Sequence, residues 1–399
     1  MGCSKDQLDL CRANVDCSGT EACVQGECIY DPNDCEVVGA FGKVTQIMPQ
    51  NAKNIIEIHT VIDETGAVHY CYFGQSETGD HVAYWGRQTA WNTFVETAII
   101  DEKGRSGDCG ALVISSEGQP FILARNLHAV LFKTGQGAWS AAALEGLSGA
   151  EAKGALSSAR VVISMSSDES GGVYLGMSLG FELYNQAVYL AHVTQGSLKL
   201  ILNGWQESKE HTAVGYAPQW LPAVKDTDSP SLLIGYPKSN TISFADADLI
   251  SLMSVEGLYH RLVVGAGGEA FVLYLGNNFQ LRLDRVKNDE LEAFASLGAV
   301  QMSQSADGQI PWAAAVDVNG ATHLLIEDQS MGGQALLFKE VSKEGKTTEG
   351  RLVSDSLETE LPGMQRYALG TDLCGRATIV IVESDQKTGG VSLRQIEGR

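Results

Sequence analysis

One short pattern constrains the fold of this chain more than any other feature: two apolar segments joined by Asp-x-x-Gly. Residues 61–69 read VIDETGAVH and residues 315–323 read AVDVNGATH, so both segments have Asp, Gly, Ala and His at matching positions. An Asp at the start of a type I turn accepts hydrogen bonds from the backbone N–H groups that follow, and Gly supplies the positive φ that the turn requires. The pattern therefore predicts a tight hairpin in which Asp and Gly serve the turn.

Looser copies of the same frame recur along the chain, from LVISSEGQPF to LGTDLCGRAT, and in VKDTDSPSLL a serine replaces the glycine. Each turn is followed by a third apolar segment and usually by a fourth, which fits four antiparallel strands per repeat. Seven copies at a mean spacing of about fifty residues predict an all-β fold, a seven-bladed β-propeller of four-stranded antiparallel blades. The turn positions are residues 66, 118, 171, 229, 268, 320 and 375.

The two ends of the repeat region complement each other. Residues 37–48, VVGAFGKVTQIM, precede the first copy and read as a strand without a hairpin partner, whereas the seventh copy ends after its third strand, VSLRQI. We therefore expect the N-terminal strand to complete the last blade and to close the ring. On this prediction the propeller covers residues 36–396. Residues 397–399 end an IEGR sequence that resembles a protease site left by a purification tag, so we set them aside.

The charge balance excludes one class of partner. The chain has 49 acidic and 28 basic residues and a net charge of −21, opposite in sign to what a nucleic-acid-binding protein needs. No run of about 18–20 apolar residues is present, so no segment reads as a membrane-spanning helix. The composition is that of a globular protein rich in short strands and turns.

The first residues carry a cysteine cluster and a candidate lipidation site. Residues 11–35 form a cysteine-rich module, which indicates an oxidising compartment. In the opening MGCS, Gly2 precedes Cys3 as a small residue precedes the acylated cysteine of bacterial lipoproteins, so we predict lipidation of Cys3 and an anchor region with a linker over residues 1–10. The alternative is acylation of both Gly2 and Cys3 in a cytosolic protein. Asp6 disfavours it, and so does the reducing compartment that it implies.

The repeat also resembles a known group of proteins. The frame D-x-x-G-x-x-H followed by an aromatic-rich third strand looks like the propeller repeats of bacterial surface lipoproteins, many of them deltaproteobacterial, and the C-x5-C-x5-C-x4-C spacing is similar to small units that precede such domains. The resemblance implies an exported propeller, lipid-anchored at the outer membrane or cell surface. It also implies the disulfides Cys11–Cys23 and Cys17–Cys28.

Strand order predicts the remaining disulfides. Cys71, in the second strand of the first blade, and Cys109, before the first strand of the second blade, fall on the same face of adjacent blades. Cys374 lies in the first hairpin of the last blade, on the opposite face, where Cys35 precedes the closing strand. We therefore predict the pairs Cys71–Cys109 and Cys35–Cys374.

Signatures of several activities are missing from the sequence. Sialidase turns, calcium loops of the D-x-D-x-D-G type and metal-ligand spacings are absent, so we predict no metal and no cofactor. The segment GDCG resembles the nucleophile loop of chymotrypsin-like cysteine proteases, with Cys109 as the nucleophile. However, His59 lies too close in sequence to complete a first barrel, and the segment falls in register with the repeat. We therefore predict no catalytic residue.

Two loops between second and third strands are candidate binding loops. Residues 176–186 include Phe181 and Tyr184, and residues 275–280 include Asn277, Asn278 and Phe279. Aromatic rings beside amide side chains suit sugars or the edge of a protein.

These observations favour a non-enzymatic, lipid-anchored surface protein that binds a glycan or an envelope protein. Two alternatives stay open: a propeller hydrolase acting at the mouth of the central channel, and a structural subunit of an envelope assembly. A hydrolase predicts two or more buried acids close together at one mouth, with raised pKa values.

Overall fold

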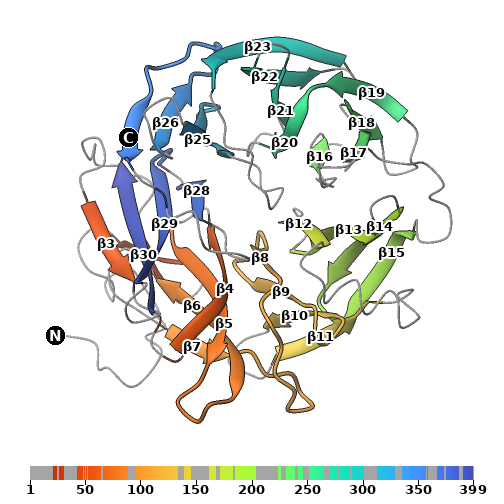
Figure 1. Cartoon of the computed structure of the whole chain (residues 1–399), viewed down its shortest axis with the longest axis vertical. Helices are drawn as coiled ribbons and strands as arrows, with labels where there is room; N and C mark the ends of the chain where they lie inside the picture. Colours follow the sequence, from red (N-terminus) through yellow and green to blue (C-terminus); the bar gives the residue numbers. More distant parts are fainter. Residues whose placement is uncertain are drawn as a thin grey trace.

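The computed structural model is all-β, with antiparallel sheets arranged in a ring as in a β-propeller (Figure 1). In the part of the chain that the structure describes, no helix could cross a membrane. The described residues are 21–24, 27–30, 43–47, 49, 51, 53–63, 66–88, 95–133, 139–144, 161–167, 171–182, 185–203, 223–225, 231–238, 241–245, 251–264, 270–276, 279–287, 290–300, 312–328, 335–355, 357, 366–372, 374–385 and 390–398.

The described strands form seven four-stranded sheets and one two-stranded hairpin of β1 (Glu21–Val24) and β2 (Glu27–Tyr30). Sheet 1 contains β4 (Lys53–Ile62), β5 (Val68–Gln75), β6 (His81–Gln88) and β7 (Val95–Ala98), and sheet 2 contains β8 (Ala111–Ile114), β9 (Pro120–Ala124), β10 (Ala129–Lys133) and β11 (Trp139–Ala143). Sheet 3 contains β12 (Val161–Ser167), β13 (Val173–Glu182), β14 (Asn185–Thr194) and β15 (Ser197–Asn203), and sheet 4 contains β16 (Ala223–Lys225), β17 (Ser231–Lys238), β18 (Thr241–Ala245) and β19 (Ser251–Glu256). Sheet 5 contains β20 (Leu258–Val264), β21 (Ala270–Leu275), β22 (Gln280–Lys287) and β23 (Glu290–Ala299), and sheet 6 contains β24 (Trp312–Val316), β25 (Thr322–Asp328), β26 (Ala335–Val341) and β27 (Arg351–Ser354). Sheet 7 contains β28 (Tyr367–Thr371), β29 (Ala377–Asp385), β30 (Gly390–Gly398) and β3 (Lys43–Ile47).

The ring has two faces that differ in the turns they carry. The first strand of each sheet lies nearest the centre, and successive first strands contact one another from β16 round to β12 (Figure 1). Because neighbouring strands are antiparallel, the turns between first and second strands, such as residues 63–67 and 317–321, all lie on one face, which we call the Asp-turn face. The first strands begin on the opposite face, where second strands also turn into third strands; we call it the site face.

Sheet 7 joins the two ends of the described chain. β3 pairs antiparallel with β30, with Lys43 opposite Glu397 and Ile47 opposite Leu393 (Figure 1). β30 continues through Gly398, so the last strand extends beyond the predicted end of the propeller at residue 396. Glu397 pairs with Thr378 of β29 and with Lys43 of β3, and Gly398 pairs with Ala377 of β29.

The Asp-turn face has the turn geometry that the repeat predicts. In the first turn the Gly66 N–H donates to the Asp63 carbonyl at 2.9 Å, and the Ala67 N–H donates to the Asp63 carboxylate at 3.0 Å. Gly66 has a φ of 80°, which a residue with a Cβ adopts only at a cost. The same combination of carboxylate and glycine recurs at residues 317–321 and 372–376.

The hydrophobic core lies between neighbouring sheets. Buried clusters join sheet 1 to sheet 2, sheet 2 to sheet 3, sheet 5 to sheet 6, sheet 6 to sheet 7 and sheet 7 to sheet 1. The largest fully buried side chains include Trp139 and Trp312, which lie in two of these clusters. Sheets 1, 2, 6 and 7 therefore bury both their surfaces against their neighbours, as sheets packed in a ring require.

One candidate binding loop is shorter than expected. β13 extends to Glu182 and β14 begins at Asn185, so Phe181 belongs to a strand and not to an exposed loop. Apolar residues alternating with glycine allow the strands to continue to this point, and a register shift between Gly180 and Glu182 marks the end of regular pairing. Other predicted residues lie outside the described residues: Cys3, Cys11, Cys17, Cys35, Tyr184, Asn277 and Asn278.

Candidate functional site

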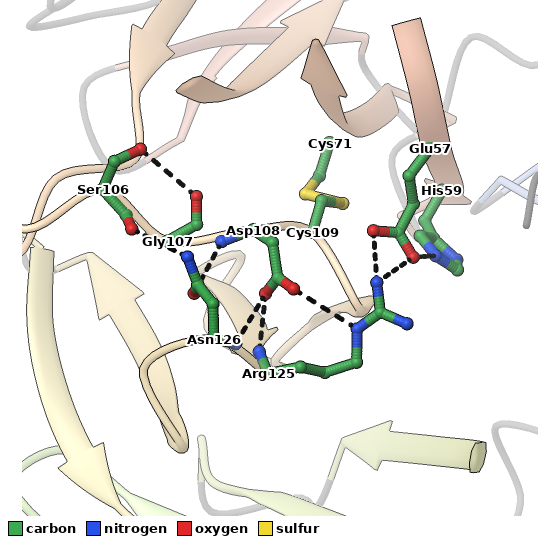
Figure 2. Close-up of a disulfide and its surroundings, with 9 residues drawn as sticks. All are labelled: Glu57, His59, Cys71, Ser106, Gly107, Asp108, Cys109, Arg125 and Asn126. Atoms are coloured by element: carbon green, nitrogen blue, oxygen red, sulfur yellow. Dashed lines mark hydrogen bonds and ion pairs between the residues drawn. A yellow bond between two sulfur atoms is a disulfide. The ribbon is translucent and has the colours of Figure 1, made fainter. Parts of the chain in front are cut away.

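The segment RSGDCG, residues 105–110, leads into β8 on the site face and contains a disulfide to the neighbouring sheet (Figure 2). Cys109 is bonded to Cys71 of β5, with their Cα atoms 6.0 Å apart, and both side chains are fully buried. This is the pair that strand order predicts, and its Cα separation is within the usual range for disulfides. A bonded, buried Cys109 cannot act as a thiolate nucleophile, so the protease interpretation of GDCG is excluded.

Two glycines of the segment allow close approach to sheet 2. A Cβ on Gly107 would lie 3.0 Å from the Ala124 Cβ, and a Cβ on Gly110 would lie 2.7 Å from the Arg125 Cγ. Any larger residue at position 110 would displace the Arg125 side chain, which lies directly over the glycine. The glycine thus leaves room for that side chain.

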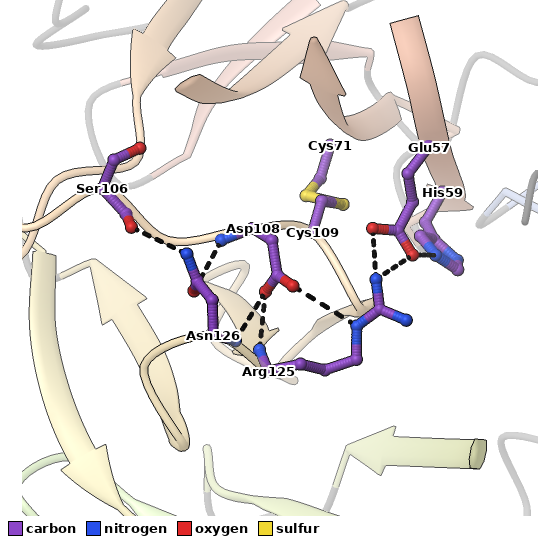
Figure 3. Close-up of polar contacts among 8 residues, drawn as sticks. All are labelled: Glu57, His59, Cys71, Ser106, Asp108, Cys109, Arg125 and Asn126. Carbon is purple, nitrogen blue, oxygen red and sulfur yellow. Dashed lines mark hydrogen bonds and ion pairs between the residues drawn. A yellow bond between two sulfur atoms is a disulfide. The ribbon is translucent and has the colours of Figure 1, made fainter. Parts of the chain in front are cut away.

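Asp108 and Asn126 hold the turn that carries Arg125. The Arg125 N–H donates to Asp108 Oδ1 at 2.6 Å, and in return the Asp108 N–H donates to Asn126 Oδ1 at 3.0 Å (Figure 3). Asn126 Nδ2 also donates to the Ser106 carbonyl at 3.1 Å. Because the bonds run in both directions, the segment and the turn after β9 fix each other's position.

The guanidinium of Arg125 lies between two carboxylates. Its Nη2 donates to both oxygens of Glu57, at 2.7 and 2.6 Å, and its Nε lies 3.4 Å from Asp108 Oδ2. His59 lies two residues along β4 from Glu57, with its Nε2 3.5 Å from Glu57 Oε1 (Figure 3). Among the described residues, none bonds the Nη1 of Arg125, whose side chain is 21% exposed.

The surroundings of this cluster oppose negative charge. Burial raises the pKa of the Asp108 carboxyl above its ordinary range; the guanidinium of Arg125 counteracts this rise, and the negative charge of Glu57 adds to it. Two carboxylates and one guanidinium leave the cluster with a single net negative charge. A further anion would meet the same unfavourable surroundings.

A second buried ion pair lies on the site face, between sheets 6 and 7. Arg366, just before β28, has its Nη2 2.7 Å from Glu327 Oε1 at the end of β25. Burial raises the pKa of Glu327, against the effect of the Arg366 guanidinium. Here both side chains are nearly covered, at 10% and 3% exposed, so this pair has a structural role between the sheets.

The site face also has unusual backbone conformations. Three described residues other than glycine have a left-handed φ: Asn54 at 50°, His128 at 50° and Phe279 at 57°. Asn54 lies at the start of β4, while His128 and Phe279 directly precede the third strands β10 and β22, so all three lie on this face. Asn and His adopt this conformation more readily than a bulky residue, which makes Phe279 the most costly of the three.

Phe279 combines this backbone with an exposed ring. Its side chain is 66% exposed, although its carbonyl accepts a hydrogen bond from the Val300 N–H at 3.1 Å. The backbone is thus held while the ring faces solvent. Phe181, the other predicted aromatic with a described backbone, lies in sheet 3, and sheet 4 separates it from Phe279. Glu57, Arg125 and Asp108 are not among the site residues that the sequence predicts.

The described residues contain no group of three or more His, Cys, Asp or Glu side chains arranged to hold a metal ion.

Comparisons with known proteins support the fold. No family model and no curated protein matches the chain. A streptogramin B lyase structure matches with a TM-score of 0.50 and 9% identity, over 90% of this chain and all of that one. A catalytically inactive variant of virginiamycin B lyase from Staphylococcus aureus with Quinupristin matches with a TM-score of 0.50 and 10% identity, over 89% of this chain and 99% of that one. At such identities the likeness supports a β-propeller fold and carries no activity.

Proposed function

We propose that this chain is a non-enzymatic binding protein that takes a surface glycan on its site face. In this proposal it is a seven-bladed β-propeller whose ring is closed by β3, and it is exported and held at the outer membrane or cell surface by a lipid on Cys3. The seven four-stranded sheets and the pairing of β3 with β30 support the architecture.

The exposed, left-handed Phe279 is the observation on which the binding function rests. A strained backbone and an exposed aromatic ring both oppose stability, and such strain is concentrated at functional sites. The amphipathic faces of sugar rings stack on such aromatic side chains, and the free edge of Arg125 on the same face offers hydrogen-bond donors for hydroxyl groups.

A protein partner is less well supported. Protein interfaces bury contiguous apolar surface, but the large exposed hydrophobic residues in the described part of the chain are scattered over sheets 1, 5 and 6, the connection between sheets 1 and 2, and both faces. They are Ile56, Ile100, Phe279, Val318 and Leu352.

The hydrolase alternative is supported by one observation, the two buried carboxylates beside Arg125. A glycosidase needs a carboxyl group that can give a proton to the leaving group. Both oxygens of Glu57 accept from Arg125 Nη2, and Asp108 Oδ1 accepts the Arg125 backbone N–H. Since both carboxylates serve Arg125, binding is the better proposal.

The buried Cys71–Cys109 disulfide supports export, because such bonds persist in oxidising compartments. Cys374 is also disulfide-bonded. Its proposed partner Cys35 and the lipidated Cys3 lie outside the described residues, as do Cys11 and Cys17 of the proposed pairs Cys11–Cys23 and Cys17–Cys28.

A glycan array probed with the full chain, followed by calorimetry on the sugars retained, tests the function. We expect Phe279→Ala to weaken binding by about tenfold or more, the size of a lost aromatic contact. The matched control is Val318→Ala, which truncates a residue 47% exposed on the Asp-turn face and should leave affinity unchanged. Retention of no glycan, capture of an envelope protein in a pull-down, or release of cleaved sugar would each contradict the proposal.

A further inference from the structure

Arg125 is held more elaborately than a structural ion pair requires. Glu57 binds its Nη2, and Asp108 flanks its Nε and caps its backbone (Figure 2). Gly110 makes room for its side chain. The Cys71–Cys109 disulfide fixes the segment that contains Asp108 and Gly110. Such support fixes the rotamer of a long, flexible side chain in advance, which lowers the entropic cost of binding.

The support leaves one edge of the guanidinium for a ligand. Nη1 has no bond to any described residue and carries two N–H donors. The pair Arg366–Glu327 provides an internal comparison, because there the arginine is half as exposed and the carboxylate is almost completely covered. Of these two ion pairs, only the one formed by Arg125 leaves an accessible edge of hydrogen-bond donors.

The charge of the cluster selects the kind of acceptor. Glu57 and Asp108 together exceed the charge of Arg125 by one negative charge, and the whole chain carries −21. In a partly buried site, these two carboxylates would appreciably repel a carboxylate of a ligand bound to Arg125. A hydroxyl or an amide carbonyl can accept from Nη1 without that repulsion, whereas a carboxylate cannot.

We infer that Arg125 is the ligand-recognising donor of the site face and that the site selects neutral sugars over sugars that carry a carboxylate. The inference rests on the proposed function and specifies its ligand class. It assigns the segment 105–110 the role of positioning Arg125.

The experiment compares matched ligands on the full chain. The probes are neutral cello-, chito- and malto-hexaose, each beside its C6-oxidised form, in which a carboxylate replaces the primary alcohol. We expect the neutral form to bind roughly tenfold more tightly, and the affinity of the oxidised form to rise with salt as repulsion is screened. Equal or tighter binding of the oxidised form, or a salt effect of the opposite sign, would overturn the inference.

Variants then assign the selectivity to Arg125. Arg125→Lys keeps the charge but loses the planar fork, and we expect neutral binding to fall by about tenfold. Glu57→Gln removes one negative charge from the cluster and should therefore reduce the difference in affinity between the neutral and the oxidised ligands. Arg366→Lys, in the second ion pair of the same face, is the matched control and should bind as the wild type does. Near-ultraviolet circular dichroism checks that each variant is folded. The salt series uses the wild-type chain, so it tests the inference even if a variant fails to fold.

The two proposals fail in different ways. If no sugar of either kind binds, the proposed function fails. If neutral sugars bind with dependence on Phe279 but Arg125→Lys has no effect, the proposed function stands and this inference fails.

Discussion

The two faces of the ring meet the same backbone requirement with different residues. On the Asp-turn face, glycine takes the left-handed positions in the first turns, at Gly66, Gly118, Gly171, Gly320 and Gly375. On the site face Gly79 and Gly104 do the same, but Asn54, His128 and Phe279 also adopt this region of φ, with side chains attached. Glycine would remove the strain of a left-handed φ at these three positions. The presence of larger residues there therefore calls for a reason other than stability. We propose that the Asp-turn face serves stability and that the site face serves binding.

Turns on the Asp-turn face also support one another across sheets. A Cβ on Gly66 would lie 3.2 Å from the Asp372 Cβ of sheet 7, and a Cβ on Gly375 would lie 2.7 Å from Asn319 Nδ2 of sheet 6. The turns of sheets 6, 7 and 1 are therefore packed in sequence, and a change in one affects the next.

The largest effect should come from a methyl group placed between these turns. Gly375→Ala combines a left-handed φ of 71° with contacts of 2.7 and 2.9 Å to Asn319 and Asp317, and we expect it to lower the free energy of unfolding by about 2–4 kcal/mol. Gly118→Ala is the matched control, because its φ is 74° but nothing lies within 4 Å. It should cost about 1–2 kcal/mol from strain alone. Urea denaturation measures both, and equal losses would show that contact between turns contributes nothing.

A smaller effect should follow from Asp317→Asn. Asp317 accepts from the Asn319 and Ala321 N–H groups at 2.8 and 2.9 Å, and from His323 Nε2 at 3.1 Å. Burial alone would raise its pKa, but these hydrogen bonds outweigh burial and lower the pKa below its ordinary 3.8. We expect the substitution to cost about 1–3 kcal/mol at pH 7, since an amide satisfies fewer of these donors.

The pH dependence distinguishes the two faces. A lowered pKa in the folded state means that the contribution of Asp317 is complete above its unfolded value and disappears as the pH falls through the folded value. The pKa of Asp108 is raised instead, so the folded state holds its proton more tightly and stability declines as the pH rises through that value. Asp317→Asn should therefore be least harmful in acid, and Asp108→Asn should be least harmful at neutral pH. Parallel pH profiles of unfolding for the two variants would contradict this contrast.

The repeat frame could be read from the sequence because its signals are local. The Asp-x-x-Gly turns, the apolar alternation and the unpaired N-terminal strand predict the all-β fold, four-stranded antiparallel sheets and the pairing of Cys71 with Cys109. The cluster around Arg125 could not be predicted, because Glu57 lies 68 residues from Arg125 and neither residue belongs to a motif. Its one local signal was the GDCG segment, in which Asp108 accepts a hydrogen bond from the Arg125 backbone and Gly110 lies against the Arg125 side chain.

The smallest effect in stability should be a gain, from Phe279→Gly. Glycine adopts a φ of 57° without strain, and the substitution removes an exposed ring. We therefore expect the free energy of unfolding to rise by up to about 1 kcal/mol. The greater backbone entropy of glycine in the unfolded chain offsets part of this gain. Glycan affinity should fall by about tenfold or more in the same variant. Asn54→Gly is the control for the backbone term, because Asn already tolerates this region, and its stability should change by a few tenths of a kcal/mol at most. Opposite signs for stability and binding at one residue are what a strained binding residue predicts. A loss of stability in Phe279→Gly would instead assign the ring to packing and would remove the observation on which the binding function rests.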